Sequence, residues 1–132
     1  MSRRWQLISA LTMSMLVAGC DTEFEQVVVV RVLNSQSQTA REVSLRYYAA
    51  ANCTGAYVAA STSPTGEARF SRKAIRGGVG VLLEEPSICV EQEGAWYSAW
   101  QEYVDPANQE NFVCRFEQDR QLICERLQQG GA

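Results

Sequence analysis

The side chains that could carry acid–base chemistry in this 132-residue chain are carboxylates. Two pairs stand close together in the sequence, Glu84 with Glu85 and Glu91 with Glu93. Paired carboxylates can act as general acid and general base, as they do in glycoside hydrolysis. Acidic residues beside turns more often serve as solubilising surface charges, and we expect that role for all four.

Other catalytic groups are missing from the sequence. The chain has no histidine, so neither Ser-His-Asp and Cys-His arrangements nor histidine-based metal sites can be built. The single lysine, Lys73, lies in a basic stretch that we expect to form a solvated loop. The glycines at 77, 78 and 80 lack the spacing of a phosphate-binding loop. We therefore predict a protein that is not an enzyme and has no metal or cofactor.

The first 19 residues have the pattern of an export signal. Arg3 and Arg4 supply positive charge, and the run from Trp5 to Ala18 is apolar and uncharged. This run is shorter than the about 20 apolar residues of a membrane-spanning helix. We therefore expect residues 1–19 to be helical in a precursor and to be removed from the mature protein.

Cys20 directly follows this segment, at the end of Leu16-Val17-Ala18-Gly19-Cys20. An apolar residue, two small residues and a cysteine in this order resemble the lipobox of bacterial lipoproteins. The resemblance implies cleavage between Gly19 and Cys20, diacylglycerol on the Cys20 thiol and usually an N-acyl chain. Two or more acyl chains hold a protein stably on a membrane. The alternative is an ordinary signal or a short membrane helix with a chance cysteine.

The mature chain would be acidic. Loss of Arg3 and Arg4 leaves 10 basic residues against 15 acidic ones, a net charge of −5. Such a domain is a poor ligand for nucleic acid or anionic lipid, so the lipid is the expected link to the membrane. Asp21 after the lipidated cysteine resembles an inner-membrane retention signal. We expect the periplasmic side of the cell envelope, with the inner membrane slightly favoured over the outer one.

Four cysteines remain if Cys20 is lipidated, and export would place them in an oxidising compartment. Their even number predicts two disulfides, for which three pairings exist. Residues 112–117 and 122–127 alternate like the arms of a hairpin, which would set Cys114 opposite Cys124. Directly opposed cysteines are close enough for a disulfide. We therefore pair Cys114 with Cys124 and, by elimination, Cys53 with Cys89.

The sequence of the rest of the mature chain predicts short strands separated by turns. Besides the two hairpin arms, strands are expected at residues 25–34, 42–49, 56–60, 67–72, 79–83 and 87–91. Pro64-Thr65-Gly66 marks a type I turn that would join two of them as a hairpin. This pattern predicts an all-β domain at residues 26–127, a small antiparallel β-sandwich or barrel. Residues 20–25 would be a lipidated tether, and residues 128–132 a flexible tail.

Residues 95–104 (AWYSAWQEYV) are rich in large aromatic side chains. Trp96, Trp100 and Val104 recur at helical spacing but also fit alternate positions of a strand, which we favour. Aromatic residues are common at protein interfaces because they give a large contact area with a polar group. The candidate interface consists of Trp96, Tyr97, Trp100 and Tyr103. In the alternative, both tryptophans fill the core and the tyrosines cover its edge.

Residues 27–70 loosely resemble prealbumin-like modules such as carboxypeptidase regulatory domains. The shared pattern is strand, loop, strand, short strand and a turn ending in glycine before an Ala-x-Phe strand, here Pro64 to Phe70. The four cysteines and the tryptophan-rich segment fall outside that pattern. The resemblance supports the sandwich fold and implies no further function.

Together these features predict a lipid-anchored envelope protein whose non-catalytic β-domain binds another envelope protein or joins an assembly. The lipid would raise the effective concentration of the domain near membrane-bound partners. The second function is an inhibitor or binder of a soluble ligand such as a lysozyme-type hydrolase, toward which an acidic domain would be steered. A glycan hydrolase that uses the four paired glutamates is the third.

Overall fold

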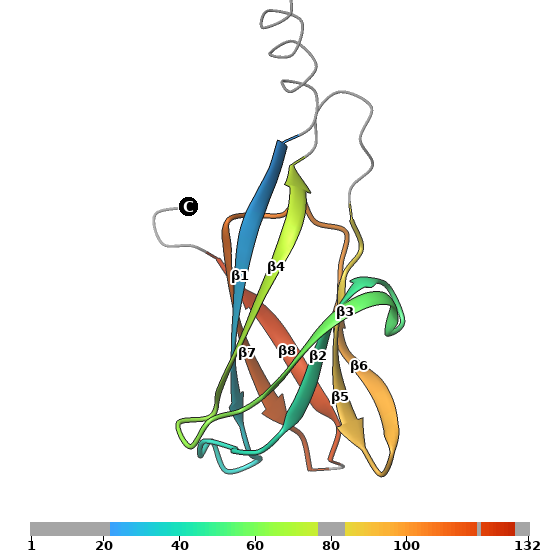
Figure 1. The fold of residues 1–132 in the computed structure, drawn as a ribbon. Coiled ribbons are helices and arrows are strands. Elements are labelled where there is room, and N and C mark those ends of the chain that lie inside the picture. Colours follow the sequence, from blue (N-terminus) through green and yellow to red (C-terminus); the bar gives the residue numbers. More distant parts are fainter. Residues whose placement is uncertain (1–21, 77–83, 119, 129–132) are drawn as a thin grey trace, which may run out of the picture.

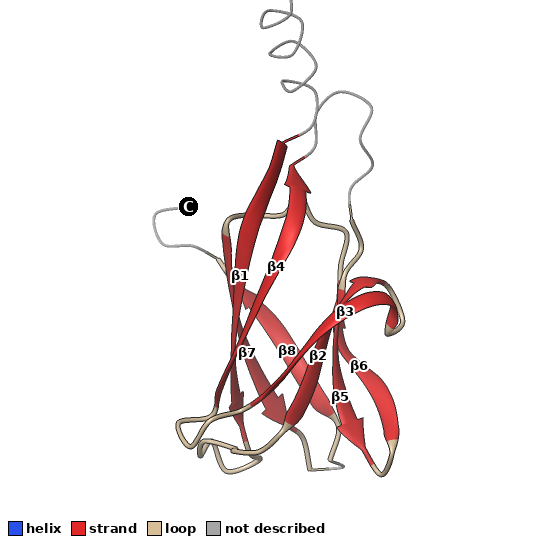
Figure 2. Ribbon diagram, viewed as in Figure 1, coloured by secondary structure: helices blue, strands red, loops and turns tan. Residues whose placement is uncertain are grey.

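The computed structural model describes residues 22–76, 84–118 and 120–128. Within these residues all regular elements are strands, arranged as two four-stranded sheets (Figures 1 and 2). The strands are β1 (Thr22–Leu33), β2 (Ser44–Ala50), β3 (Thr54–Ser61), β4 (Glu67–Arg76), β5 (Ser87–Gln92), β6 (Ala95–Gln101), β7 (Gln109–Phe116) and β8 (Leu122–Leu127). This confirms the predicted all-β sandwich. The predicted signal segment, Cys20, the strand at 79–83 and residues 129–132 lie outside the described residues.

One sheet has the strand order β4-β1-β7-β8 and the other has the order β3-β2-β5-β6. Paired strands are antiparallel except β1 and β7, which are parallel. The central position of β1 explains its run of four valines. Val28 and Val30 are fully buried against the other sheet, while Val27 and Val29 are half-buried on the outer face.

β1 and β4 are longer than the sequence predicted. β1 begins at Thr22, inside the expected tether, and its first residues pair with the end of β4, where Glu23 lies opposite Ile75. The basic stretch around Lys73 is therefore strand and not loop. The inward alternation of β4 continues as far as Ala74, which is buried, and this explains the correction. Figure 1 shows this pair of strands extending beyond the rest of the sandwich.

The turn before β4 forms as predicted, but it does not join a hairpin. The Gly66 amide donates a hydrogen bond to the Ser63 carbonyl over 2.8 Å. β3 pairs with β2 whereas β4 pairs with β1, so the chain crosses between the sheets at this turn. Gly66 has φ +78°, and a Cβ there would lie 2.9 Å from the carbonyl oxygen of Val32. Glycine is required because the crossing chain packs closely on β1.

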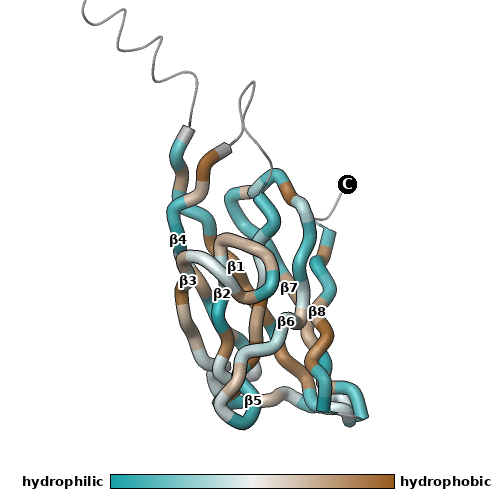
Figure 3. Tube along the Cα trace, turned by 90° about the vertical axis from the view of Figure 1, so that its right-hand side faces the viewer, coloured by the Kyte–Doolittle hydropathy of each residue, from teal (hydrophilic) through white to brown (hydrophobic). Residues whose placement is uncertain are grey.

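The core fills the space between the two sheets. Apolar and polar residues alternate along the strands in Figure 3, as expected for strands with one buried face. Trp100 and Phe112 join the sheets by an edge contact with 4.6 Å between ring centroids. The largest fully buried apolar side chains are Tyr47, Phe70, Phe112, Leu45 and Ile88.

Both predicted disulfides are present. In the β7–β8 hairpin Cys114 lies directly opposite Cys124 and is bonded to it, which confirms the predicted register. The second bond joins Cys53, in the turn between β2 and β3, to Cys89 of β5. Cys89 points to the outer face of its sheet, so this bond holds the turn over that face.

Candidate functional site

A β-bulge separates the aromatic residues that the sequence grouped together. The register between β5 and β6 shifts between Ile88 and Cys89, and Ala99 has no residue opposite it. One extra residue reverses the alternation of side chains along a strand. Trp96 therefore lies on the outer face of the sheet, and Trp100 points to the inner face. Residues 95–101 form a strand, as the sequence analysis favoured.

The four predicted interface residues do not share one face. Trp100 is 8% exposed and belongs to the core, as the alternative interpretation expected of both tryptophans, whereas Trp96 is half-buried and lies outside the core cluster. Tyr97 is 53% exposed and follows Trp96 on the opposite side of the strand. Tyr103 is 70% exposed in the connection between β6 and β7. Only Trp96 remains on the open outer face.

Trp96 is part of a cluster that the sequence analysis missed. The guanidinium carbon of Arg46 lies 4.0 Å from the ring centroid of Trp96 and 4.0 Å from that of Tyr57. Tyr57 comes from β3 and Trp96 from β6, so the rings approach from opposite sides of β2. We call Tyr57, Arg46 and Trp96 the guanidinium stack. Cation–π contacts of this kind contribute about 0.5–2 kcal/mol each, depending on desolvation.

The strand register explains why the guanidinium stack forms. Arg46 lies opposite Ala59 of β3, whose small side chain leaves room for the long arginine side chain, and opposite the disulfide-bonded Cys89 of β5. Its Nη1 donates a hydrogen bond to the Tyr48 hydroxyl over 2.9 Å. The Tyr48 ring in turn lies 5.1 Å from that of Tyr57. The alternation of β2 could have placed Arg46 on the outer face, but only the register reveals its neighbours.

Arg46 lacks the usual partners of a half-buried cation. Among the described residues no carboxylate lies within ion-pair distance of it. Its Nε is buried and has no hydrogen-bond acceptor in that part of the chain. A buried donor without an acceptor costs about 1–3 kcal/mol. The stack therefore holds a partly desolvated positive charge on the open face of the sheet.

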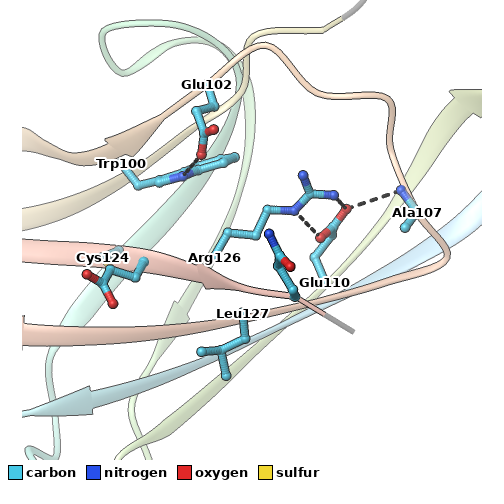
Figure 4. Close-up of a pocket in the computed structure, with 9 residues that line it drawn as sticks. Trp100, Glu102, Ala107, Glu110, Cys124, Arg126 and Leu127 are labelled. Atoms are coloured by element: carbon cyan, nitrogen blue, oxygen red, sulfur yellow. Dashed lines mark hydrogen bonds and ion pairs between the residues drawn. The ribbon is translucent and has the colours of Figure 1, made fainter. Parts of the chain in front are cut away.

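A second feature is a cleft of about 630 Å³ between β6 and β8 (Figure 4). Arg126 donates from Nε and Nη2 to the buried Glu110, over 2.7 and 2.6 Å. Glu110 also accepts a hydrogen bond from the Ala107 amide over 3.2 Å. The indole N–H of Trp100 donates to Glu102 over 2.8 Å. Of the three glutamates that line the cleft, Glu102 and Glu110 accept hydrogen bonds from the chain and Glu125 is exposed. The hydrogen bond to Glu110 raises the pKa of Arg126.

The two glutamate pairs, Glu84 with Glu85 and Glu91 with Glu93, lie at opposite ends of β5. Glu84 precedes β5 and forms an ion pair with Arg72. Glu91 lies near the other end of β5 and accepts a hydrogen bond from the Gly94 amide over 3.0 Å. A six-residue strand is roughly 20 Å long, so the two pairs are too far apart to act on one bond.

A polar network fills one end of the space between the sheets. Arg72 donates from Nε to the Gln26 side chain over 2.8 Å, and Gln26 donates to the Ala107 carbonyl over 2.9 Å. The guanidinium of Arg72 also lies 5.0 Å from the ring centroid of Tyr47. Burial raises the pKa of Tyr47 to about 12, and the charge of Arg72 opposes this shift.

The described residues contain neither a metal-binding cluster nor a membrane-spanning helix. No group of three or more His, Cys, Asp or Glu side chains in residues 22–76, 84–118 and 120–128 could hold a metal ion. The same stretches contain no helix with the length and apolar character needed to cross a bilayer.

Comparisons with known proteins assign no family. No family model and no curated protein matches the chain. A disulfide-locked mutant of intermedilysin with human CD59 is 12% identical over 78% of the chain, with a TM-score of 0.33. A structure described as a trapped toxin is 12% identical over 78%, with a TM-score of 0.36. The chain spans 24% and 23% of those chains, and likeness at this level carries no functional assignment.

Proposed function

We propose that this chain is a lipid-anchored envelope protein whose non-catalytic β-sandwich binds another envelope protein. The binding surface is the outer face of the sheet β3-β2-β5-β6. The observation that carries the proposal is the guanidinium stack, in which Tyr57 is 49% exposed beside a cation without an acidic partner in the described chain. Tyrosine, tryptophan and arginine are the residue types that most often dominate binding energy at protein interfaces.

The sequence around Cys20 supports the anchor. Diacylglycerol and an N-acyl chain on Cys20 would keep the domain on the periplasmic side of a membrane, with the inner membrane favoured by Asp21. Confinement to a surface raises the effective concentration near membrane-bound partners, so a modest interface is sufficient for binding. The domain thus acts by being held near its partner and not by chemistry.

The anchor is tested by metabolic labelling with an alkyne fatty acid. The natural chain is expected to take up the label and to sediment with membranes. A Cys20→Ser variant, which lacks the thiol that would accept the lipid, is expected to lose both properties. Equal labelling of the two proteins would exclude lipidation at this position.

The binding face is tested by crosslinking in intact cells. We expect the natural chain to capture one envelope protein and a Tyr57→Ala/Trp96→Ala variant to lose it. Tyr103→Ala is the matched control, because it removes an exposed aromatic side chain that lies outside the stack. Folding of each variant is checked by urea unfolding and by the two disulfides. Capture that survives the double substitution would refute this face, and capture of a soluble hydrolase would favour the inhibitor function.

A further inference from the structure

Arg46 differs from the arginines that the domain uses internally. Arg72 and Arg126 each form an ion pair with a glutamate, Glu84 and Glu110. Arg46 has no such partner among the described residues although it is half-buried. A partly desolvated cation without a counter-charge is unfavourable, so bringing an anion to it is favoured.

The geometry of the stack limits how an anion can approach. The guanidinium carbon of Arg46 lies 4.0 Å from the ring centroids of both Tyr57 and Trp96, so an anion must reach Arg46 beside the two rings, through its N–H donors. Nη1 is used by Tyr48, and no hydrogen bond in the described chain involves Nη2. A planar anion that lies in the guanidinium plane can accept from this edge. Carboxylates have this shape and form the strongest planar pairs with arginine.

The Arg46 side chain is already ordered before an anion binds. The two rings hold the arginine side chain in place, so little rotamer freedom is lost when an anion binds. The Nε atom of Arg46 is also buried, and charge interactions are stronger where water is excluded. An exposed, mobile arginine has neither advantage.

The charge of the whole domain narrows the class of ligand. The mature chain would carry a net charge of −5, so its overall field repels polyacidic partners such as nucleic acids. A single carboxylate within an otherwise apolar or basic protein surface escapes most of this repulsion. Such a surface also matches the aromatic rings on either side of Arg46.

We infer that the guanidinium stack is a carboxylate-binding site that receives an Asp or Glu side chain, or a C-terminal carboxylate, of the protein partner. The inference rests on the proposed function of this sheet face. It adds the chemical identity of the group that docks there. Arg46 supplies the hydrogen bonds, while Tyr57 and Trp96 supply the apolar walls.

The test is a titration of the full-length chain in detergent micelles, followed by NMR of the Arg46 side-chain N–H and the Trp96 indole N–H. Sodium acetate is the probe, with sodium chloride at equal ionic strength as the control. Acetate is expected to move both signals to saturation, whereas chloride leaves them in place. Inorganic phosphate is titrated next and is expected to bind more weakly. Shifts that are equal in acetate and chloride would overturn the site, and tighter binding of phosphate would overturn the carboxylate assignment.

An Arg46→Lys variant separates this inference from the proposed function. Lysine keeps the charge but not the planar donor edge, so acetate binding should weaken by about tenfold. In the crosslinking experiment, Arg46→Lys is compared directly with Tyr57→Ala/Trp96→Ala. If the lysine variant captures the partner undiminished and the double variant loses it, the proposed binding face stands and the carboxylate site is overturned. Saturable acetate binding by a natural chain that captures no envelope protein would support the site and refute the proposed function.

Discussion

Removal of the Cys53–Cys89 bond should destabilise the domain more than removal of the Cys114–Cys124 bond. The first joins residues 36 positions apart and the second joins residues 10 positions apart. In the chain-entropy model the loss of a cross-link costs about 3.8 kcal/mol for the longer loop and about 2.7 kcal/mol for the shorter one at 25 °C. Loop length alone therefore predicts a difference of about 1 kcal/mol.

The local structure acts on this difference in both directions. The β7–β8 hairpin is also held by strand pairing from Asn111–Leu127 to Phe116–Leu122, and we expect this pairing to remain without the disulfide. The turn that carries Cys53 is joined to β5 by the disulfide and by a hydrogen bond from the Cys53 amide to the Ser87 hydroxyl, 3.1 Å long. Asn52 and Cys53 also have φ angles of 59° and 56°, in the left-handed region that disfavours residues with a Cβ. Loss of the bond would let this turn relax, and the strain released would offset part of the cost of removing the disulfide.

The assay compares full-length Cys53→Ala/Cys89→Ala and Cys114→Ala/Cys124→Ala variants by urea unfolding with tryptophan fluorescence. With a denaturant slope of about 1–2 kcal/mol per molar urea, the first variant should unfold about 0.5–1 M earlier than the second. Equal midpoints, or the reverse order, would refute the reasoning from loop length.

Three other predictions test features of the fold. Gly66→Ala should cost at least about 2 kcal/mol of unfolding free energy and Gly94→Ala only about 1 kcal/mol, because both have positive φ but only Gly66 packs against β1. Equal costs in urea unfolding would contradict this. Burial favours the neutral phenol of Tyr47, so the neutral form stabilises the folded state. This contribution is complete below pH 10, and the free energy of unfolding should fall by about 2–3 kcal/mol as the pH rises to 12. Unfolding at pH 9 and pH 12 should show this loss, and Tyr47→Phe should reduce it. Glu110→Gln should cost about 2 kcal/mol because it breaks the charged hydrogen bonds to Arg126; a change below about 0.5 kcal/mol would show that solvent replaces them.

The alternation of side chains between neighbouring residues was sufficient to predict most strands and, together with the cysteine count, both disulfides. Alternation in the two hairpin arms placed Cys114 opposite Cys124, and elimination then gave Cys53–Cys89. Side-chain alternation is a property of neighbouring residues, so it can be read from the sequence without knowing the fold.

The remaining features depend on which strands become neighbours. The turn at Gly66 has the same local signature whether it closes a hairpin or crosses between sheets. The bulge at Ala99 is visible only in the pairing of β6 with β5, and it divides Trp96 from Trp100. The contacts of Arg46 span all four strands of one sheet. Such contacts arise from long-range register, which a single sequence does not encode in any local pattern.

The early start of β1 has a consequence for how the protein would stand in the envelope. With lipid on Cys20, as proposed, only Asp21 would separate the anchor from the first residue of β1. Two residues span at most about 7 Å, so the sandwich could not swing freely on its attachment. The start of β1 would rest at the head groups, and the connection from β6 into β7, which carries the exposed Tyr103, lies toward the same end of the sandwich. The β5–β6 turn, next to Trp96, lies at the far end (Figure 1). The anchor would thus hold the guanidinium stack at a fixed distance from the membrane surface. Partners whose acidic group lies at the same distance would be selected.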